Sequence, residues 1–489
     1  MRQVSISVVV VASVVASGCG DNQGPADAAI ERCASDPCRN DGACTDTASG
    51  VSCACSPGFE GDRCEVASWS IPAPTRDVDL LFVVDNSGSM QTEQQRLVDA
   101  FGDLLAAITD GDGVLPNVHV GVVSSNVGGA GQAGVPGCPA QGDDGTLQAT
   151  ITNTPTHCAS LTDAFASDVA TAGGRDTNYT GSLADTFACL ATRGTYGCGF
   201  EMHLESAWRA LQPDKNPGFY RPGAHLAVII VADEDDCSTR DGAMFGDPTA
   251  TLESTLGPRT SFRCHEFGVV CDDDPTPRAF GERSGCRPIE DPIYEFPVAK
   301  YVDFFGQLKA PRRLTLSGFL GTYDGSHLTV AQDPSPGAPV GWPAVKRSCG
   351  FDENDPDAGA SPPVRLAAFL GAFGARARHA SACDASFADT MRQIGSDVAS
   401  SMASVICIEP QLADDDPAAG LQPRCTVALT ASTGQTPIPR CTTGQAPPCW
   451  NIGSDARSCP DTANALWVTI DAAFAPAVDA TLDVRCETP

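Results

Sequence analysis

Apolar and polar residues follow two different periods along the middle of the chain. The largely apolar run Val78–Val84 predicts a strand that is buried on both faces. From Gln91 to Ile108, apolar residues recur at helical spacing, so we expect an amphipathic helix directly after this strand. Further apolar runs predict buried strands at Val118–Val123, His225–Ala232 and Leu314–Leu320.

Helical spacing also appears in six other segments, at Leu161–Ala170, Leu183–Ala191, Phe200–Leu211, Tyr294–Leu308, Val364–Ala375 and Phe387–Met402. Strands that alternate with helices form mostly parallel sheets with helices on both faces. We therefore predict an α/β fold with a Rossmann-like, doubly wound, mostly parallel sheet over residues 77–405. Two Pro- and Gly-rich stretches, at about 237–290 and 324–363, interrupt the pattern and are expected to be insertions.

The segments before and after this region have a different amino-acid composition. Residues 33–64 are short and cysteine-rich, and residues 65–76 read as a linker. Residues 406–489 contain short β-like runs among Pro, Gly and six cysteines. We expect a small disulfide-held module before the α/β domain and a small β-rich, disulfide-tied region after it.

The 23 cysteines indicate an oxidising compartment, because a cytosolic chain would keep so many thiols reduced. Zinc is the competing explanation, but paired C-x-x-C spacings are missing and the seven histidines are scattered. A net charge of 31 − 61 = −30 argues against nucleic acid and anionic membrane surfaces as partners. The same charge would attract divalent cations.

Residues 1–18 have the features of an export signal, since the apolar run Val4–Ala16 is too short to span a bilayer. The run ends in Ala16-Ser17-Gly18-Cys19, which resembles a bacterial lipobox. The resemblance implies a lipid on Cys19, a tether over 19–32 and a location in the bacterial cell envelope, at the outer membrane or cell surface. Removing Cys19 from pairing leaves 22 cysteines, an even number. The alternative is ordinary cleavage nearby, with Cys19 in a disulfide.

The first cysteine block has the spacing Cys33-x4-Cys38-x5-Cys44-x8-Cys53-x-Cys55-x8-Cys64, with a Pro-Gly-Phe-Glu-Gly run at 57–61. This pattern resembles an EGF-like module. The resemblance implies the pairs Cys33–Cys44, Cys38–Cys53 and Cys55–Cys64. The lead before Cys33 departs from the calcium-binding pattern, so we expect a spacer or contact module without its own calcium site.

Three oxygen-bearing residues follow the first strand as Asp85-x-Ser87-x-Ser89, directly before the predicted helix. Ligands of open α/β sheets bind beyond the carboxyl ends of the strands. Oxygen ligands suit Mg²⁺, with Mn²⁺ or Ca²⁺ as substitutes. Helix capping is the alternative for these residues, but one residue would suffice for a cap. Asp233 follows the strand His225–Ala232 and is the expected second acid of the site.

This arrangement resembles the metal-ion-dependent adhesion site of a von Willebrand factor A-type domain. The resemblance implies a further threonine ligand on a loop before a helix. Thr195 fits this role, and Thr180 is its rival. Cys189 and Cys198 flank the Thr195 loop and could pair to hold it.

Near-neighbour pairing is the most economical disulfide arrangement for the remaining cysteines. It predicts Cys138–Cys158, Cys189–Cys198, Cys264–Cys271 and Cys349–Cys383, with Cys237–Cys286 closing the first insertion. The six C-terminal cysteines would pair among themselves.

Catalytic signatures such as G-x-S-x-G, a Walker loop or H-E-x-x-H do not occur in the sequence. We expect a binding protein rather than an enzyme. It would be a cell-surface adhesion lipoprotein that engages an extracellular or envelope protein through its metal site, to which the partner offers a carboxylate. The membrane would be contacted through the N-terminal lipid only. The alternatives are a metal-independent scaffold lipoprotein of the cell envelope and, with less support, an envelope hydrolase.

Overall fold

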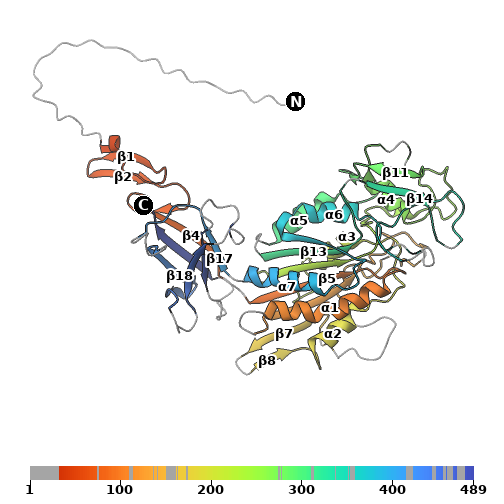
Figure 1. Cartoon of the computed structure of the whole chain (residues 1–489), viewed down its shortest axis with the longest axis horizontal. Coiled ribbons are helices and arrows are strands. Elements are labelled where there is room, and N and C mark those ends of the chain that lie inside the picture. The colour runs from red at the N-terminus through yellow and green to blue at the C-terminus, as the bar shows by residue number, and fades with distance from the viewer. Residues whose placement is uncertain are drawn as a thin grey trace, which may run out of the picture. The chain divides into compact units, whose positions relative to one another are not determined.

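The computed structural model describes residues 32–489 apart from 74–75, 110–113, 136, 140, 150–160, 162, 172–173, 274–275, 277, 310–312, 326, 336, 351, 353–357, 403, 415–421, 443–447, 455–458, 460–465 and 471–479. They form two compact units, one of residues 70–409 and 426–483, the other of residues before 70 with 410–425 and 484–489. Figure 1 labels their elements. The predicted signal peptide and Cys19 lie outside the described residues. In the part that is described, no helix is long and apolar enough to cross a membrane.

A seven-stranded sheet lies at the centre of the larger unit, in the order β16-β13-β9-β5-β6-β7-β8. The strands from β16 to β6 are parallel, and β7 and β8 are antiparallel. Their bounds are β5 (Asp77–Val84), β6 (Asn117–Ser124), β7 (Ala166–Thr171), β8 (Gly174–Thr177), β9 (His225–Val231), β13 (Leu314–Leu320) and β16 (Ala377–Ser381). Strands β6, β7 and β8 follow β5 in chain order on one side of the sheet, and β13 and β16 follow β9 on the other. The carboxyl ends of β5 and β9 therefore flank the switch point where such sheets bind ligands.

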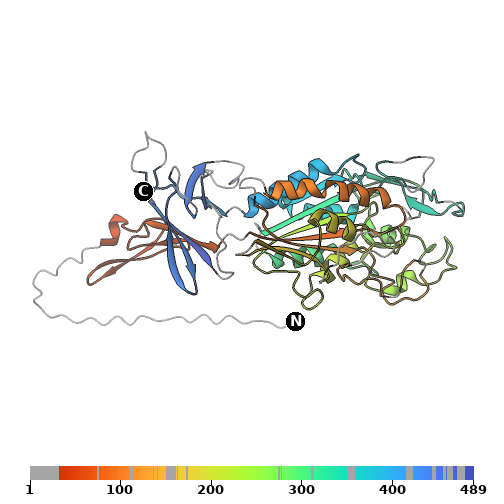
Figure 2. The same cartoon turned by 90° about the horizontal axis from the view of Figure 1, so that it is seen from below.

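Helices cover both faces of this sheet (Figure 2). One face carries α1 (Gln91–Thr109), α2 (Leu183–Ala191) and α7 (Ala388–Met402), and the other carries α3 (His203–Ala210), α5 (Val298–Leu308) and α6 (Val364–Gly371), which is followed by the short helix η4 (Gly374–Arg376). Alternate residues of β5 enter the two cores: Phe82 packs with α1 and α2, and Val83 with the opposite layer. The predicted α/β fold with a mostly parallel sheet is confirmed.

One predicted helix is wrong. Ala166–Thr171, within the expected helix Leu161–Ala170, is the antiparallel strand β7. Burial alternates along it, with Ala166 and Asp168 buried and their neighbours half-buried, which is the period of a strand. Pairing with β6 decides the conformation, and a short polar segment carries little evidence of such pairing in its own pattern.

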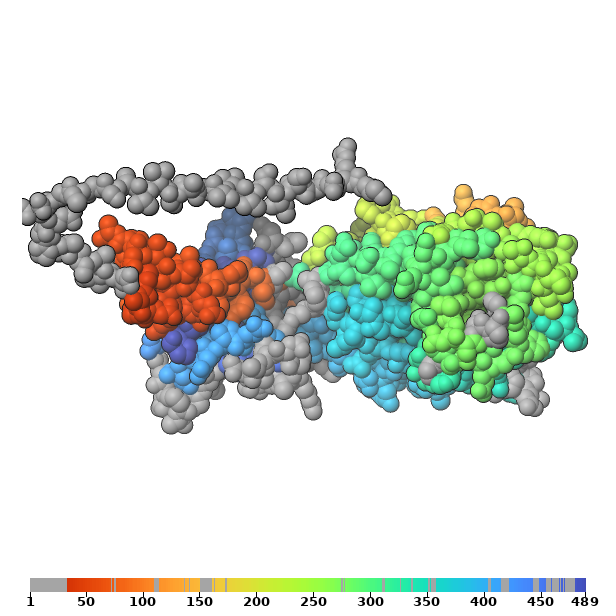
Figure 3. Space-filling model, turned by 90° about the horizontal axis from the view of Figure 1, so that it is seen from above, coloured from red at the N-terminus to blue at the C-terminus, as the bar shows by residue number. Residues whose placement is uncertain are grey.

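The two insertions share a small antiparallel sheet that the sequence pattern did not reveal. Its order is β11-β14-β15, with β11 (Gly281–Ser284) from the first insertion and β14 (His327–Gln332) and β15 (Pro343–Val345) from the second. The first insertion also contains η2 (Gly242–Phe245), α4 (Phe262–Gly268), β10 (Val269–Val270) and β12 (Arg287–Pro288). In Figure 3 these segments, coloured green to teal, form a continuous surface at one end of the larger unit.

The remaining elements of the described chain are short strands and one short helix, η1. The N-terminal elements are η1 (Arg32–Ser35), β1 (Ala43–Thr47), β2 (Gly50–Ala54), β3 (Phe59–Glu60) and β4 (Val66–Pro72). The C-terminal strands are β17 (Ser404–Ile408), β18 (Cys425–Ala431), β19 (Gly434–Ile438), β20 (Trp450–Ser454), β21 (Leu466–Ile470) and β22 (Thr481–Glu487). They form sheets of order β17-β21-β20 and β19-β18-β22-β4-β3, so the expected β-rich C-terminal texture is present.

The disulfides at the two ends of the chain are as expected. The N-terminal block contains Cys33–Cys44, Cys38–Cys53 and Cys55–Cys64, the pairs implied by the EGF-like resemblance. The C-terminal cysteines pair among themselves, as Cys407–Cys459, Cys425–Cys486 and Cys441–Cys449. Disulfides of this number are typical of an oxidising, extracytoplasmic compartment.

Near-neighbour pairing fails in the α/β unit, where only Cys349–Cys383 follows it among the described pairs. Cys198 pairs with Cys138 instead of Cys189, which is itself disulfide-bonded. The other pairs are Cys237–Cys264 and Cys271–Cys286, in place of Cys264–Cys271 and Cys237–Cys286, and Cys158 lies outside the described residues. The fold brings distant loops together, and distance in space decides which thiols meet.

Candidate metal centre

Asp85 lies immediately after β5, and its side chain is completely buried. Its Oδ1 accepts hydrogen bonds from the Ser87 amide at 2.8 Å and the Ser125 hydroxyl at 3.2 Å. Its Oδ2 is 3.2 Å from Nε2 of His203, at the start of α3. Neighbours on its own turn, directly after β6 and at the start of α3 therefore hold this carboxylate in one orientation at the carboxyl edge of the sheet.

Two other predicted ligands have buried oxygens without a bonding partner. Ser89 hydrogen-bonds the carboxylate of Asp233, which follows β9. Ser87 Oγ and Asp233 Oδ1 are buried and have no hydrogen-bond partner among the described residues. Such atoms are rare in folded proteins and call for an explanation. A hard cation that takes oxygen ligands would supply the missing interaction.

The Thr195 loop is joined to the Asp85 turn by hydrogen bonds. Gln94 Nε2 donates to the carbonyl oxygens of Asp85 at 2.8 Å and Gly194 at 2.9 Å. Gln94 Oε1 accepts from the Arg193 amide at 2.9 Å. The rival, Thr180, lies on a different loop, where the neighbouring Tyr179 bonds Asp168 of β7. The structure therefore brings the Thr195 loop to the predicted site.

This loop approaches the turn closely at one glycine. The Gly197 amide donates to the Asn86 carbonyl oxygen at 2.7 Å. A Cβ at Gly197 would lie 2.2 Å from Asn86 Oδ1, so a larger residue would separate the loop from the turn. One residue further, Cys198 is bonded to Cys138, which ties the Thr195 loop covalently to the loop after β6.

The sequence reasoning did not identify Ser125, Glu201 or His203 as site residues. Ser125 follows the predicted strand Val118–Val123, so the same strand-end argument that found Asp233 would have found it. Glu201 lies two residues before α3 and His203 is the first residue of that helix, and both are buried. Neither belongs to a local motif, and the fold alone brings them beside Asp85.

Acidic side chains are concentrated in this buried region. Burial and the neighbouring Asp85 charge raise the pKa of Asp233 to about 8, and Arg347 opposes the rise. Burial and the charges of Glu234 and Asp85 raise the pKa of Glu201 well above its usual value. Burial disfavours protonation of His203, but the hydrogen bond to Asp85 and its charge outweigh that effect and raise the pKa of His203. Each of these directions reports a site that would be stabilised by positive charge.

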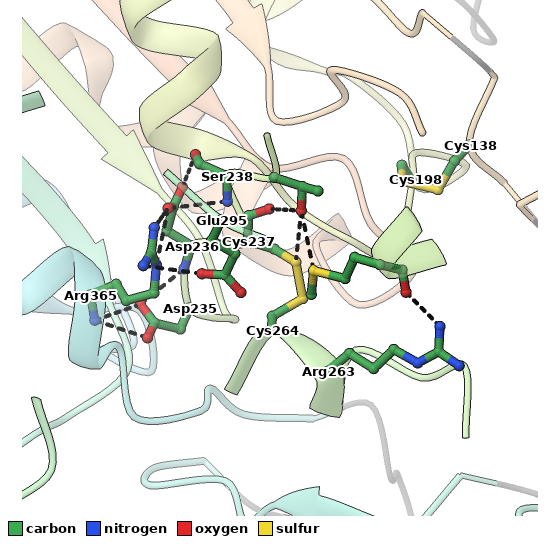
Figure 4. Close-up of a disulfide and its surroundings, with 12 residues drawn as sticks. Cys138, Cys198, Asp235, Asp236, Cys237, Ser238, Arg263, Cys264, Glu295 and Arg365 are labelled. Atoms are coloured by element: carbon green, nitrogen blue, oxygen red, sulfur yellow. Dashed lines mark hydrogen bonds and ion pairs between the residues drawn. A yellow bond between two sulfur atoms is a disulfide. The ribbon is translucent and has the colours of Figure 1, made fainter. Parts of the chain in front are cut away.

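A second group of buried charged side chains helps to position the residues of the candidate metal centre (Figure 4). Arg365 of α6 pairs with Asp236 at 3.1 Å and with Glu295 at 3.0 Å. Asp236 Oδ1 also accepts a hydrogen bond from the Leu204 amide at 2.9 Å, which fixes the first turn of α3. Because His203 belongs to that turn, the ion pair positions the ring that contacts Asp85.

The candidate centre opens into a cavity of about 990 Å³. Ser87, Ser89, Glu201 and Glu234 line one part of it, and residues of both insertions, including Trp342, line the rest. Within the described residues, no three or more His, Cys, Asp or Glu side chains are gathered as they would be around an ion. The predicted ligand set is of another kind, with two carboxylates and hydroxyl groups.

Comparisons with known proteins identify the N-terminal block. The family model of the EGF-like domain matches residues 33–63. No curated protein matches the chain. A solved structure titled von Willebrand factor type A from Catenulispora acidiphila is similar over 89% of this chain and 67% of its own, with 12% identity and a TM-score of 0.27. The pilus adhesin SpaC from Lactobacillus rhamnosus GG, in an open conformation, is similar over 91% of this chain and 42% of its own, with 9% identity and a TM-score of 0.29. At these TM-scores, neither likeness carries an argument about this chain.

Proposed function

We propose that this chain is a cell-surface binding protein whose α/β unit is a von Willebrand factor A-type domain that holds a divalent cation and binds a protein partner through it. The observation that carries the proposal is the pair of buried oxygens without partners among the described residues, Ser87 Oγ and Asp233 Oδ1, beside the buried Asp85. Mg²⁺ is the expected ion, with Mn²⁺ or Ca²⁺ as substitutes, because the donors are all oxygens.

The proposed ligands are Asp85, Ser87, Ser89, Thr195 and Asp233. Ser125 and His203 orient Asp85 through its two oxygens, and Gln94 holds the Thr195 loop against the turn. The cation would supply electrostatic attraction for a carboxylate of the partner, which would enter through the cavity above Ser87 and Ser89.

For the rest of the chain we propose a lipid on Cys19 and a spacer role for the EGF-like module at 33–64. The module is too small for an apolar core and depends on its three disulfides. Labelled palmitate should enter the wild-type chain in bacterial cells, and Cys19→Ser should abolish the labelling. Equal labelling of both chains would contradict the anchor.

The cation site is tested by titrating MnCl₂ into the purified chain in a calorimeter. We expect binding to the wild type and a loss of affinity of at least about 100-fold in Asp85→Asn, since the substitution removes a charged ligand while keeping its size. Asp214→Asn is the matched control, because Asp214 is exposed after α3 and its loss changes the net charge equally. If Mn²⁺ bound equally to the wild type and Asp85→Asn, or to neither, the metal-independent scaffold would be the better hypothesis.

A further inference from the structure

A guanidinium group of the second insertion lies beside the candidate metal centre. Arg347 Nη1 donates to the Asp233 carbonyl oxygen at 3.2 Å and is 3.4 Å from Asp233 Oδ2. Arg347 Nη2 is 3.6 Å from Glu234 Oε1. The side chain is only 11% exposed. A permanent positive charge is thus placed between two adjacent acids, one of which is a proposed cation ligand.

The loop that carries Arg347 is fixed, so this pairing is built into the fold. Two residues further along, Cys349 is bonded to Cys383, which follows β16. The Ser361 amide donates to the Asp233 carbonyl oxygen at 2.7 Å, and the Lys346 amide donates to the Thr329 carbonyl oxygen at 2.8 Å. An exposed arginine on a free loop would gain little from such an ion pair, because holding the long side chain costs conformational entropy. Here the surrounding chain already restricts the loop.

Arg347 lies among several acidic side chains of the candidate metal centre and is positioned to compensate part of their charge. Asp85, Asp233, Glu201 and Glu234 are acids whose charges interact with one another in this part of the unit. Arg347 and Glu234 also line the same cavity as Ser87 and Ser89, so a cation that enters this cavity would meet the guanidinium.

We propose that Arg347 is the resident counter-ion of the cation site, which pairs with Asp233 and Glu234 in the cation-free protein and lowers the affinity of the site for a divalent cation. This inference rests on the proposed function. Two effects follow from one charge: Arg347 offsets repulsion between the acids when the ion is absent, and it repels the ion when the ion binds. Loss of the Arg347 charge should therefore lower the stability of the cation-free protein and raise its affinity for the cation.

The test compares Mn²⁺ affinity and thermal unfolding of the full chain in the wild type, Arg347→Gln and Arg347→Lys. Arg347→Gln should bind Mn²⁺ roughly 3- to 10-fold more tightly, the effect of one partly screened charge near the ion. It should also unfold at a lower temperature in EDTA, and Mn²⁺ should restore more of its stability than in the wild type. Arg347→Lys keeps the charge and should stay close to the wild type.

Arg378→Gln is the control. It removes the same positive charge as Arg347→Gln, but from an arginine that forms an ion pair with Asp397 elsewhere in the unit. It should leave Mn²⁺ affinity unchanged. Unchanged or weaker affinity in Arg347→Gln would overturn the inference while leaving the proposed function intact. So would an Arg347→Gln chain that is unfolded with and without excess Mn²⁺, because the arginine would then be purely structural. A wild type that binds no Mn²⁺ would overturn the proposed function and this inference together.

Discussion

A buried aspartate lies near each end of strand β5, and the two have different surroundings. Asp79, near the start, is fully buried and accepts two hydrogen bonds from one arginine, from the Arg221 amide at 2.7 Å and Nε at 2.8 Å. Asp85, just after the end, is also fully buried, but its partners are an amide, a hydroxyl and a histidine, and more acids lie nearby.

The difference shows how a structural acid can be told from a ligand-binding one. Arg221 gives Asp79 its opposite charge and also donates to the carbonyl oxygens of Val78 and Asn117, so the pair ties a loop to the sheet. At the Asp85 end, acidic side chains outnumber basic ones, and Ser87 Oγ and Asp233 Oδ1 lack partners among the described residues. A buried carboxylate with a charged partner is balanced within the fold and is destabilising only when that partner is removed, whereas an unbalanced group of carboxylates favours an external cation.

The largest effect is expected at the balanced end. Arg221→Gln leaves Asp79 buried without its charged partner and should lower the free energy of unfolding by about 3–5 kcal/mol. Urea denaturation measures the loss. Arg378→Gln is the control, because it removes an arginine whose side chain is 37% exposed and should cost under about 1 kcal/mol. Equal losses in the two variants would show that Asp79 does not depend on Arg221.

A somewhat smaller loss of folding stability is expected when the pH rises, because Asp79 at the same end of β5 becomes ionised. Burial raises the pKa of Asp79 to about 6, although Arg221 opposes the rise. Because the folded value lies above the unfolded value of 3.8, this group's stabilising contribution is complete below pH 4 and is lost as the pH rises through 6. The loss should approach ~3 kcal/mol by pH 7.

Urea denaturation of the wild type and Asp79→Asn at pH 4 and pH 7 isolates this contribution, since the amide does not titrate. The wild type should lose more stability between the two pH values than Asp79→Asn does. Asp214→Asn, at an exposed site, should follow the wild type. Parallel behaviour of the wild type and Asp79→Asn would contradict the assignment.

The smallest effect on stability is expected at the unbalanced end, where cation affinity is the sharper measurement. Gln94→Ala removes the bonds that join the Asp85 turn to the Thr195 loop. It should weaken Mn²⁺ binding about tenfold, as for other groups that orient a ligand, and cost about 1–2 kcal/mol of stability. Gln95→Ala, at the exposed neighbouring position, should change neither. Wild-type affinity in Gln94→Ala would show that Gln94 does not position the Thr195 loop for cation binding.

Local sequence patterns predicted the helices and strands that have strong periodicity. They failed where pairing between strands decided the conformation. Strands β5, β6, β9 and β13 were visible as apolar runs, because they are buried on both faces of the sheet. The antiparallel strand β7 was mistaken for a helix, because its conformation depends on β6. The shared sheet of the two insertions was missed for the same reason, since β11 and β14 come from different insertions.

By itself the sequence determined which residues stand at the carboxyl ends of β5 and β9. Asp85, Ser87, Ser89 and Asp233 were identified because the ends of parallel strands share one edge of a sheet, which follows from strand order along the chain. Only the tertiary structure decided that Cys198 meets Cys138, that the Thr195 loop reaches Gln94, and that Arg347 lies against Asp233, 114 residues away. Those contacts join segments far apart in the chain, and no local period or propensity encodes how such segments meet.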